Sequence, residues 1–161
     1  MEAKLRKHRS RLKISGYAVI AFGLWSIIRI FLMRYFDPLS FEAMLGEETD
    51  IPREFYDEVV FTGLLVFLAF YLLYRFFVGR AAIREGSGNR RKMLYVFFAL
   101  LYGLISVCGD IHYTVLLFSQ GGRLIGLTDI LVDLSACVAM FEIVYSAAAI
   151  RVLEKKAREV C

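Results

Sequence analysis

Four long apolar stretches limit what this chain can fold into. They run from Ile14 to Met33, from Val59 to Val78, from Met93 to Phe118 and from Leu124 to Ile150. A hydrocarbon core of about 30 Å needs roughly 20 apolar residues in a helix, whereas a membrane-spanning strand needs only about 10 residues that alternate in polarity. Because these stretches are long and continuous, they predict an all-α integral membrane protein, an antiparallel bundle of four transmembrane helices.

The composition and the connections agree with one membrane-embedded unit. With 58% apolar residues and a mean hydropathy of +0.57, the chain falls outside the usual range of soluble enzymes. We expect a single membrane domain over residues 1–161. Its predicted parts are transmembrane helices at about 14–34, 57–79, 92–118 and 124–151, an external acidic loop at 35–56 and a cytoplasmic turn at 85–92.

The acidic loop allows two interpretations. The segment from Asp37 to Glu58 holds eight of the sixteen acids in the chain. Such a segment suggests a vestibule that collects cations, or a weak Ca²⁺ site. The alternate spacing and the glycine of an EF-hand are missing, so a solvated acidic loop is the simpler interpretation.

The distribution of Lys and Arg sets the expected orientation. Sixteen of the twenty lie before the first apolar stretch, at or beyond the end of the second, or beyond the end of the fourth. The remaining four are Arg29, Arg34, Arg53 and Arg123. The positive-inside rule therefore predicts that both termini and the middle connection are cytoplasmic, and we expect the plasma membrane as the location. The basic segments should lie against anionic lipid headgroups at the cytoplasmic face rather than bind nucleic acid.

Short sequence matches indicate an internal duplication. The residues Ala81–Arg84, at the end of the second predicted helix, recur as Ala148–Arg151 at the end of the fourth. With an offset of 80 positions, Gly23 and Leu24 of the first helix match Gly103 and Leu104 of the third. These matches fall in the order that two tandem helical hairpins require. Since both hairpins begin in the cytoplasm, they would be parallel repeats related by an axis along the membrane normal.

Polar residues at membrane depth are the candidates for function, because a charge at the bilayer centre costs about 2.5 to 3.5 kcal/mol on insertion scales. Counting along the helices places five of them in the outer leaflet or its interface, where we expect one cluster. They are Arg29, Asp110, His112, Asp129 and Asp133. Carboxylates together with an imidazole suggest a site for protons or a cation. The alternative is that these groups only link neighbouring helices.

The duplication also predicts two ion pairs. An offset of 80 places Arg29 within one position of Asp110, and an offset of 67 places Arg75 opposite Glu142. Opposite charges at equivalent depths can pair across the pseudo-axis between the hairpins. We therefore predict an outer pair of Arg29 with Asp110 and an inner pair of Arg75 with Glu142.

Two classes of function remain open. The first is a small proton- or cation-linked transporter, or a channel-like protein, that uses the cluster. The second is a non-catalytic membrane partner or accessory subunit, with a second copy or another membrane protein as its partner. Whether the chain is an enzyme stays open, but no catalytic motif favours it. No cofactor is predicted. Cys108, His112 and Cys137 are lesser metal candidates, and cysteines at helix packing surfaces are the simpler interpretation.

Overall fold

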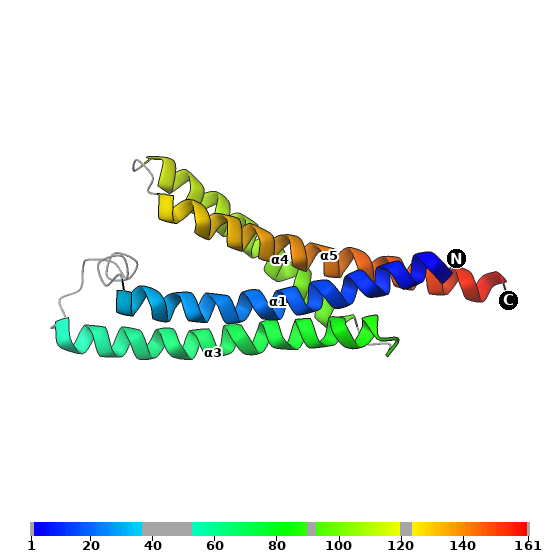
Figure 1. Ribbon diagram of the computed structural model, residues 1–161, viewed down its shortest axis with the longest axis horizontal. Coiled ribbons are helices and arrows are strands. Elements are labelled where there is room, and N and C mark those ends of the chain that lie inside the picture. The colour runs from blue at the N-terminus through cyan, green and yellow to red at the C-terminus, as the bar shows by residue number, and fades with distance from the viewer. Residues whose placement is uncertain (1, 37–52, 90–92, 120–123, 161) are drawn as a thin grey trace.

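The computed structural model is built from helices that run in alternating directions (Figure 1). It describes residues 2–36, 53–89, 93–119 and 124–160, and these residues contain four α-helices and no strand. The helices are α1 (Glu2–Phe36), α3 (Arg53–Gly86), α4 (Leu94–Ser119) and α5 (Leu124–Val160). Both ends of the chain lie at one end of the molecule, which we call the terminal end; the opposite end is the distal end. The all-α prediction is confirmed.

Three of the helices are long and apolar enough to cross a membrane. Within the described part of the chain these segments are Glu2–Phe36, Val59–Gly86 and Leu131–Ala157. The corresponding segment of α4, Leu94–Gly109, is shorter, although the helix continues to Ser119. At the terminal end α1, α3 and α5 extend beyond the predicted ranges, because the charged segments there are rich in Lys, Arg, Glu, Leu and Ala, which favour helix.

A turn is expected at residues 85–92, but α3 continues to Gly86 and then ends in a defined helix cap. Gly88 has a φ of 99°, its amide donates to the Glu85 carbonyl at 2.9 Å, and the Asn89 amide donates to the Arg84 carbonyl at 3.1 Å. These two bonds make a Schellman motif, in which glycine adopts the left-handed conformation. Glu85 therefore belongs to the last turn of α3. Residues 90–92 of the predicted turn, and 37–52 of the predicted acidic loop, lie outside the described residues.

Glycines bring α1 and α3 into close contact. A Cβ at Gly16 would lie 2.8 Å from the Gly79 carbonyl oxygen, and a Cβ at Gly79 would lie 2.6 Å from the Gly16 carbonyl oxygen. At the distal end the Arg34 guanidinium lies 3.6 Å from the centre of the Phe61 ring. The two helices therefore pair along most of their length, as Figure 1 shows.

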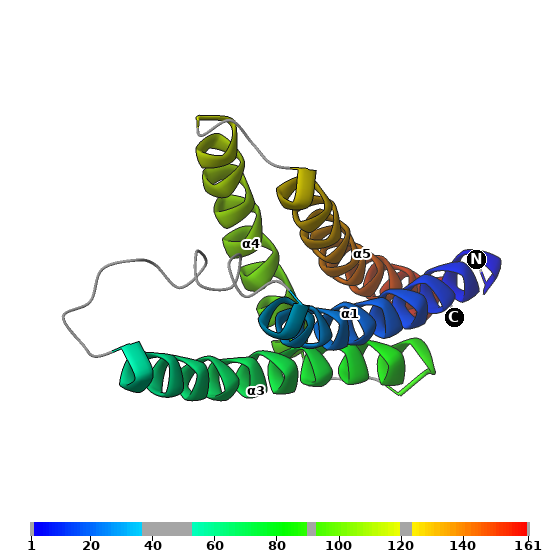
Figure 2. The same cartoon turned by 60° about the vertical axis from the view of Figure 1, so that its left-hand side comes forward.

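The second hairpin leans away from the first. Figure 2 shows that α4 and α5 diverge from α1 and α3 toward the distal end, whereas α5 lies close to α1 at the terminal end. The buried apolar core receives side chains from all four helices, such as Val19, Val78, Ala99 and Met140. The tightly packed part of the molecule is thus its terminal half.

The first prediction concerns the glycine contact between α1 and α3. Gly79→Ala should lower the midpoint of thermal unfolding in detergent, because its Cβ collides with the α1 backbone at a cost of about 1 to 3 kcal/mol. The matched control is Gly63→Ala in the same helix, where a Cβ has no neighbour within 4 Å. The control should be neutral or slightly stabilising, since alanine favours helix over glycine by up to about 1 kcal/mol. Equal unfolding midpoints for the two variants would refute a role of this contact in holding α1 to α3.

Candidate functional site

Arg75 carries a permanent charge within the apolar span of α3. It lies about 16 Å before Gly86 along the helix axis, at about 1.5 Å per residue. Its side chain is buried, with only 1% of the residue exposed. Gly23 of α1 makes room for it, since a Cβ there would lie 3.1 Å from the Arg75 Cδ. A charge at this depth is costly unless its surroundings compensate it, so the neighbours of the guanidinium determine what it can do.

Tyrosines from α3 and α4 surround this guanidinium. Arg75 Nη2 donates to the Tyr102 hydroxyl at 2.7 Å, and the Tyr102 hydroxyl donates to the Tyr71 hydroxyl at 3.0 Å. The guanidinium carbon lies 4.6 Å from the centre of the Tyr71 ring and 5.1 Å from that of Tyr102, which is the range of cation–π attraction. Tyr74 packs its ring against Tyr102, and its hydroxyl donates to the Phe98 carbonyl. We call Arg75, Tyr71, Tyr74 and Tyr102 the arginine–tyrosine cluster.

The arginine–tyrosine cluster leaves part of the guanidinium without an acceptor. Arg75 Nε and Nη1 are buried and donate no hydrogen bond. Among the described side chains, no carboxylate lies within ion-pair distance of Arg75. A buried donor without an acceptor costs about 1 to 3 kcal/mol, and more when it is charged. Arg75 therefore holds buried donors that a further acceptor would satisfy.

Asp133 is the carboxylate whose charge acts on this region. It lies on α5, is partly buried, and interacts electrostatically with Arg75 of α3 and with Arg29 of α1. Tyr102 adds a hydroxyl from α4. All four helices therefore contribute polar groups that interact electrostatically or by hydrogen bonds, and we call Arg29, Asp133 and the arginine–tyrosine cluster the central site.

The central site contains two of the five residues predicted as the outer cluster. Arg29 and Asp133 lie within electrostatic range of each other. The side chains of Asp110, His112 and Asp129 lie outside those that the structure describes, so the predicted pair of Arg29 with Asp110 stays a prediction.

Arg75 and Glu142 are the predicted inner pair, but in the structure each has another partner. Arg11 Nη1 lies 3.6 Å from Glu142 Oε1, and the Ser146 hydroxyl donates to the same oxygen at 3.1 Å. Arg75 instead bonds to Tyr102. The reason is that the basic amino-terminal segment continues α1 and brings Arg11 alongside α5, while Arg75 faces α4.

The lesser metal candidates lie on two helices. Cys108 is exposed on α4, Cys137 is buried on α5, and both are free thiols rather than halves of a disulfide. The side chain of His112 is not among the described ones. Within the described part of the chain, no three potential ligands come together for a metal ion.

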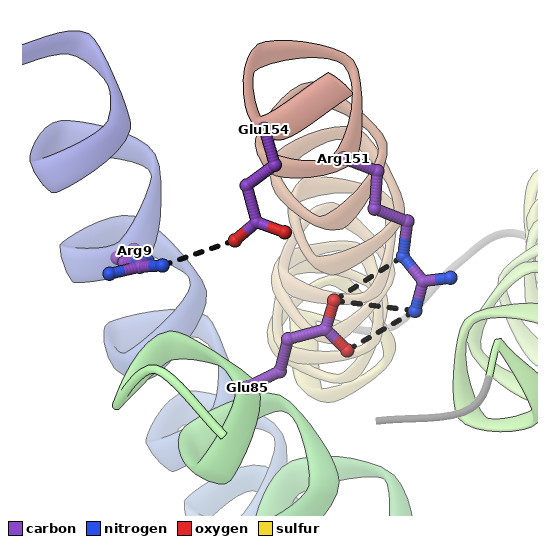
Figure 3. Close-up of polar contacts among 4 residues, drawn as sticks. All are labelled: Arg9, Glu85, Arg151 and Glu154. Carbon is purple, nitrogen blue, oxygen red and sulfur yellow. Dashed lines mark hydrogen bonds and ion pairs between the residues drawn. The ribbon is translucent and has the colours of Figure 1, made fainter. Parts of the chain in front are cut away.

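A second group of charged side chains forms ion pairs between helices at the terminal end (Figure 3). Arg151 Nη2 of α5 lies 3.3 Å from both carboxylate oxygens of Glu85 on α3, and Arg9 Nη2 of α1 lies 3.1 Å from Glu154 Oε1 on α5. Glu85 is 4% exposed, and the Tyr95 hydroxyl is buried beside it. We call the pairs Glu85–Arg151, Arg9–Glu154 and Arg11–Glu142 the terminal ion pairs. They join α1, α3 and α5.

Sequence reasoning missed the tyrosines of the central site and the terminal ion pairs. Tyr71, Tyr74 and Arg75 do carry a signal, because residues three and four positions apart share one face of a helix. Glu85 carries no comparable signal, since its partner Arg151 lies 66 positions away along the chain.

The central site combines a permanent cation, an ionisable carboxylate and hydroxyl groups that donate and accept hydrogen bonds. These groups are suited to binding a proton and a small ion. No family model, no curated protein and no solved structure matches this chain. The chemistry of the site therefore carries the functional argument.

The second prediction concerns the buried pair of Glu85 with Arg151. Glu85→Gln keeps the shape of the side chain but removes the negative charge that pairs with Arg151. Since the Arg151 side chain is 19% exposed, we expect the lower end of the range for breaking a buried pair, about 3 kcal/mol less stability to unfolding. The control is Glu159→Gln, whose Lys155 partner is 3.9 Å away on an exposed surface; it should change stability by less than about 0.5 kcal/mol. A Glu85→Gln protein as stable as the control would contradict a role of the terminal ion pairs in joining the hairpins.

Proposed function

We propose that this chain is an integral membrane protein with four transmembrane helices in an antiparallel bundle. Besides the three apolar spans, α4 has 26 residues and a length of about 39 Å, which exceeds a hydrocarbon core of about 30 Å. The shared location of the two termini supports an even number of crossings (Figure 1). The basic residues at the terminal end support its assignment to the cytoplasm, against anionic headgroups, with the plasma membrane as the location.

Two similar glycine contacts support the interpretation as tandem hairpins. Gly23 of α1 lies against Arg75 of α3, and Gly103 of α4 lies 3.2 Å, measured from its built Cβ, from the Phe141 ring of α5. The offset of 80 relates the two glycines, and the offset of 67 relates Phe141 to Tyr74, the neighbour of Arg75. Each hairpin thus packs a glycine of its first helix against a large side chain of its second, and the two large side chains are one position apart under the offset of 67.

The third prediction tests the proposed orientation. A fluorescent protein that matures only in the cytoplasm should be bright when fused to either terminus, and alkaline phosphatase, which is active only outside it, should be inactive at both. Phosphatase fused after Phe36, within a chain truncated there, should be active, because one helix has then crossed the membrane. Phosphatase activity at exactly one terminus would require an odd number of crossings and would refute the four-span topology.

We further propose that the protein is a small proton- or cation-linked transporter or channel-like protein, and that the central site is where it binds its ions. The observations that carry this proposal are the buried Arg75 donors without acceptors and the electrostatic interaction of Asp133 on α5 with Arg29 of α1 and Arg75 of α3. Charges that only link helices gain most when they pair directly, as Glu85 does with Arg151. Arg75 instead retains buried donors without acceptors. This incomplete compensation favours a binding role.

Asp133 is the group that takes up and releases the proton in this proposal. A guanidinium keeps its proton in proteins, so Arg29 and Arg75 supply fixed positive charge. Protonation of Asp133 removes its attraction to both, and thereby changes the electrostatic link between α5 and the first hairpin. Since α4 and α5 already diverge from α1 and α3 at the distal end (Figure 2), a change in this link would alter the separation of the hairpins there.

The fourth prediction tests Asp133. The purified chain in liposomes should show flux of monovalent ions driven by a pH gradient, and Asp133→Asn should reduce this flux to the level of empty liposomes, because asparagine has a similar shape but cannot take up the proton. The matched control is Ser135→Ala on the same helix, whose hydroxyl is exposed and bonds to the Leu131 carbonyl. Its flux should equal that of the wild type. Normal flux in an Asp133→Asn protein would remove this carboxylate from the mechanism.

An accessory role is the second candidate, and one observation favours it. Near the distal end of α1 there is an apolar hollow lined by Ile27, Ile28, Phe31, Leu32, Tyr35 and Phe36. A helix of a partner membrane protein would bury this surface. Absence of flux from the wild-type protein, together with a partner that co-purifies in fixed proportion, would support this role over transport.

A further inference from the structure

We propose that the central site binds a small monovalent anion at Arg75, together with the proton on Asp133. This inference rests on the proposed transport function and names the class of ion that accompanies the proton. Its observations are the buried Arg75 donors without acceptors, the electrostatic interaction of Asp133 with Arg75 and Arg29, and the tyrosine rings beside the guanidinium.

The unused donors of Arg75 require an acceptor. Of its three nitrogens, only Nη2 has a partner, the neutral Tyr102 hydroxyl. Nε and Nη1 are buried without one, in a residue that is 1% exposed. An anion would supply acceptor atoms to Nε and Nη1 and add negative charge beside the guanidinium, whereas a cation would be repelled by it.

The charges around the site link anion binding to proton binding. The described groups that face it are Arg29 from α1, Arg75 with its tyrosines from α3, Tyr102 from α4 and Asp133 from α5. When Asp133 carries its charge, it partly compensates the two guanidiniums. When Asp133 is protonated, that compensation is lost and the attraction for an external anion rises. Proton and monovalent anion then bind together, and their combined movement transfers no net charge.

The tyrosine rings restrict the size of the ion. The rings of Tyr71 and Tyr102 lie within 4.6 and 5.1 Å of the guanidinium carbon. A bulky organic ion would have to displace them, and with them the hydrogen bond between their hydroxyls. Chloride, nitrate and pyruvate are suitable small probes, and gluconate is a large anion for comparison.

The fifth prediction is that small anions stabilise the protein through Arg75. The midpoint of thermal unfolding of the full chain in detergent should rise with the concentration of chloride, nitrate or pyruvate, more at mildly acidic than at neutral pH, and not with gluconate at equal ionic strength. Arg75→Gln should lose this shift. Arg80→Gln, which removes an exposed arginine of the same helix, should keep it. An equal shift with gluconate, or an unchanged shift in Arg75→Gln, would overturn the proposal.

Two further measurements cover a misfolded Arg75→Gln protein and separate anion binding from transport. If Arg75→Gln does not fold, Arg75→Lys retains the charge but lacks the guanidinium donors, and it should bind the anion more weakly than the wild type; unchanged binding would overturn the proposal. In liposomes, flux should require both the small anion and the pH gradient and should not respond to membrane potential. Anion binding without any flux would refute the transport function but not the anion site. Cation flux without anion binding would refute the anion site but not the transport function.

Discussion

The compensation of charge inside an apolar bundle determines how these helices fit together. Glu85 is almost fully buried, and its partner Arg151 comes from the last helix, so α3 and α5 satisfy both charges in only one register. Arg9 and Arg11 then align α1 with α5. Figure 3 shows two of the three terminal ion pairs, Glu85–Arg151 and Arg9–Glu154, and the divergence of the hairpins toward the distal end in Figure 2 is consistent with a junction at the terminal end.

Two buried charged residues, Glu85 and Arg75, have different kinds of partners. Glu85 is matched by both carboxylate contacts to Arg151, and the result is a fixed junction. Arg75 is matched by one hydroxyl and by the faces of two rings, which stabilise a cation without neutralising it. The first arrangement suits a structural link, and the second suits a site whose occupancy changes. This contrast within one bundle is the main reason to assign function to the central site.

The helices could be predicted because long apolar stretches need no knowledge of their neighbours. The central site could be predicted only in part. Arg29, Arg75 and Asp133 can be identified because charges are conspicuous in apolar stretches, whereas Tyr71 and Tyr102 are compatible with lipid and give no such contrast. The expected turn at 85–92 includes Glu85, but the Schellman cap shows that the helix continues through Gly86 and that Gly88 leaves the helical conformation. Contacts between the hairpins depend on tertiary packing, which no local pattern encodes.

The origin of these partners also constrains the assembly of the protein. Arg75 and Glu85 both belong to the first hairpin, but Tyr102 and Arg151, which compensate them, belong to the second. While the chain is being synthesised, the first hairpin is therefore complete in length before Tyr102 and Arg151 are available to it. It gains these contacts only after the second hairpin has been translated. The two hairpins therefore complete their folding together rather than one after the other.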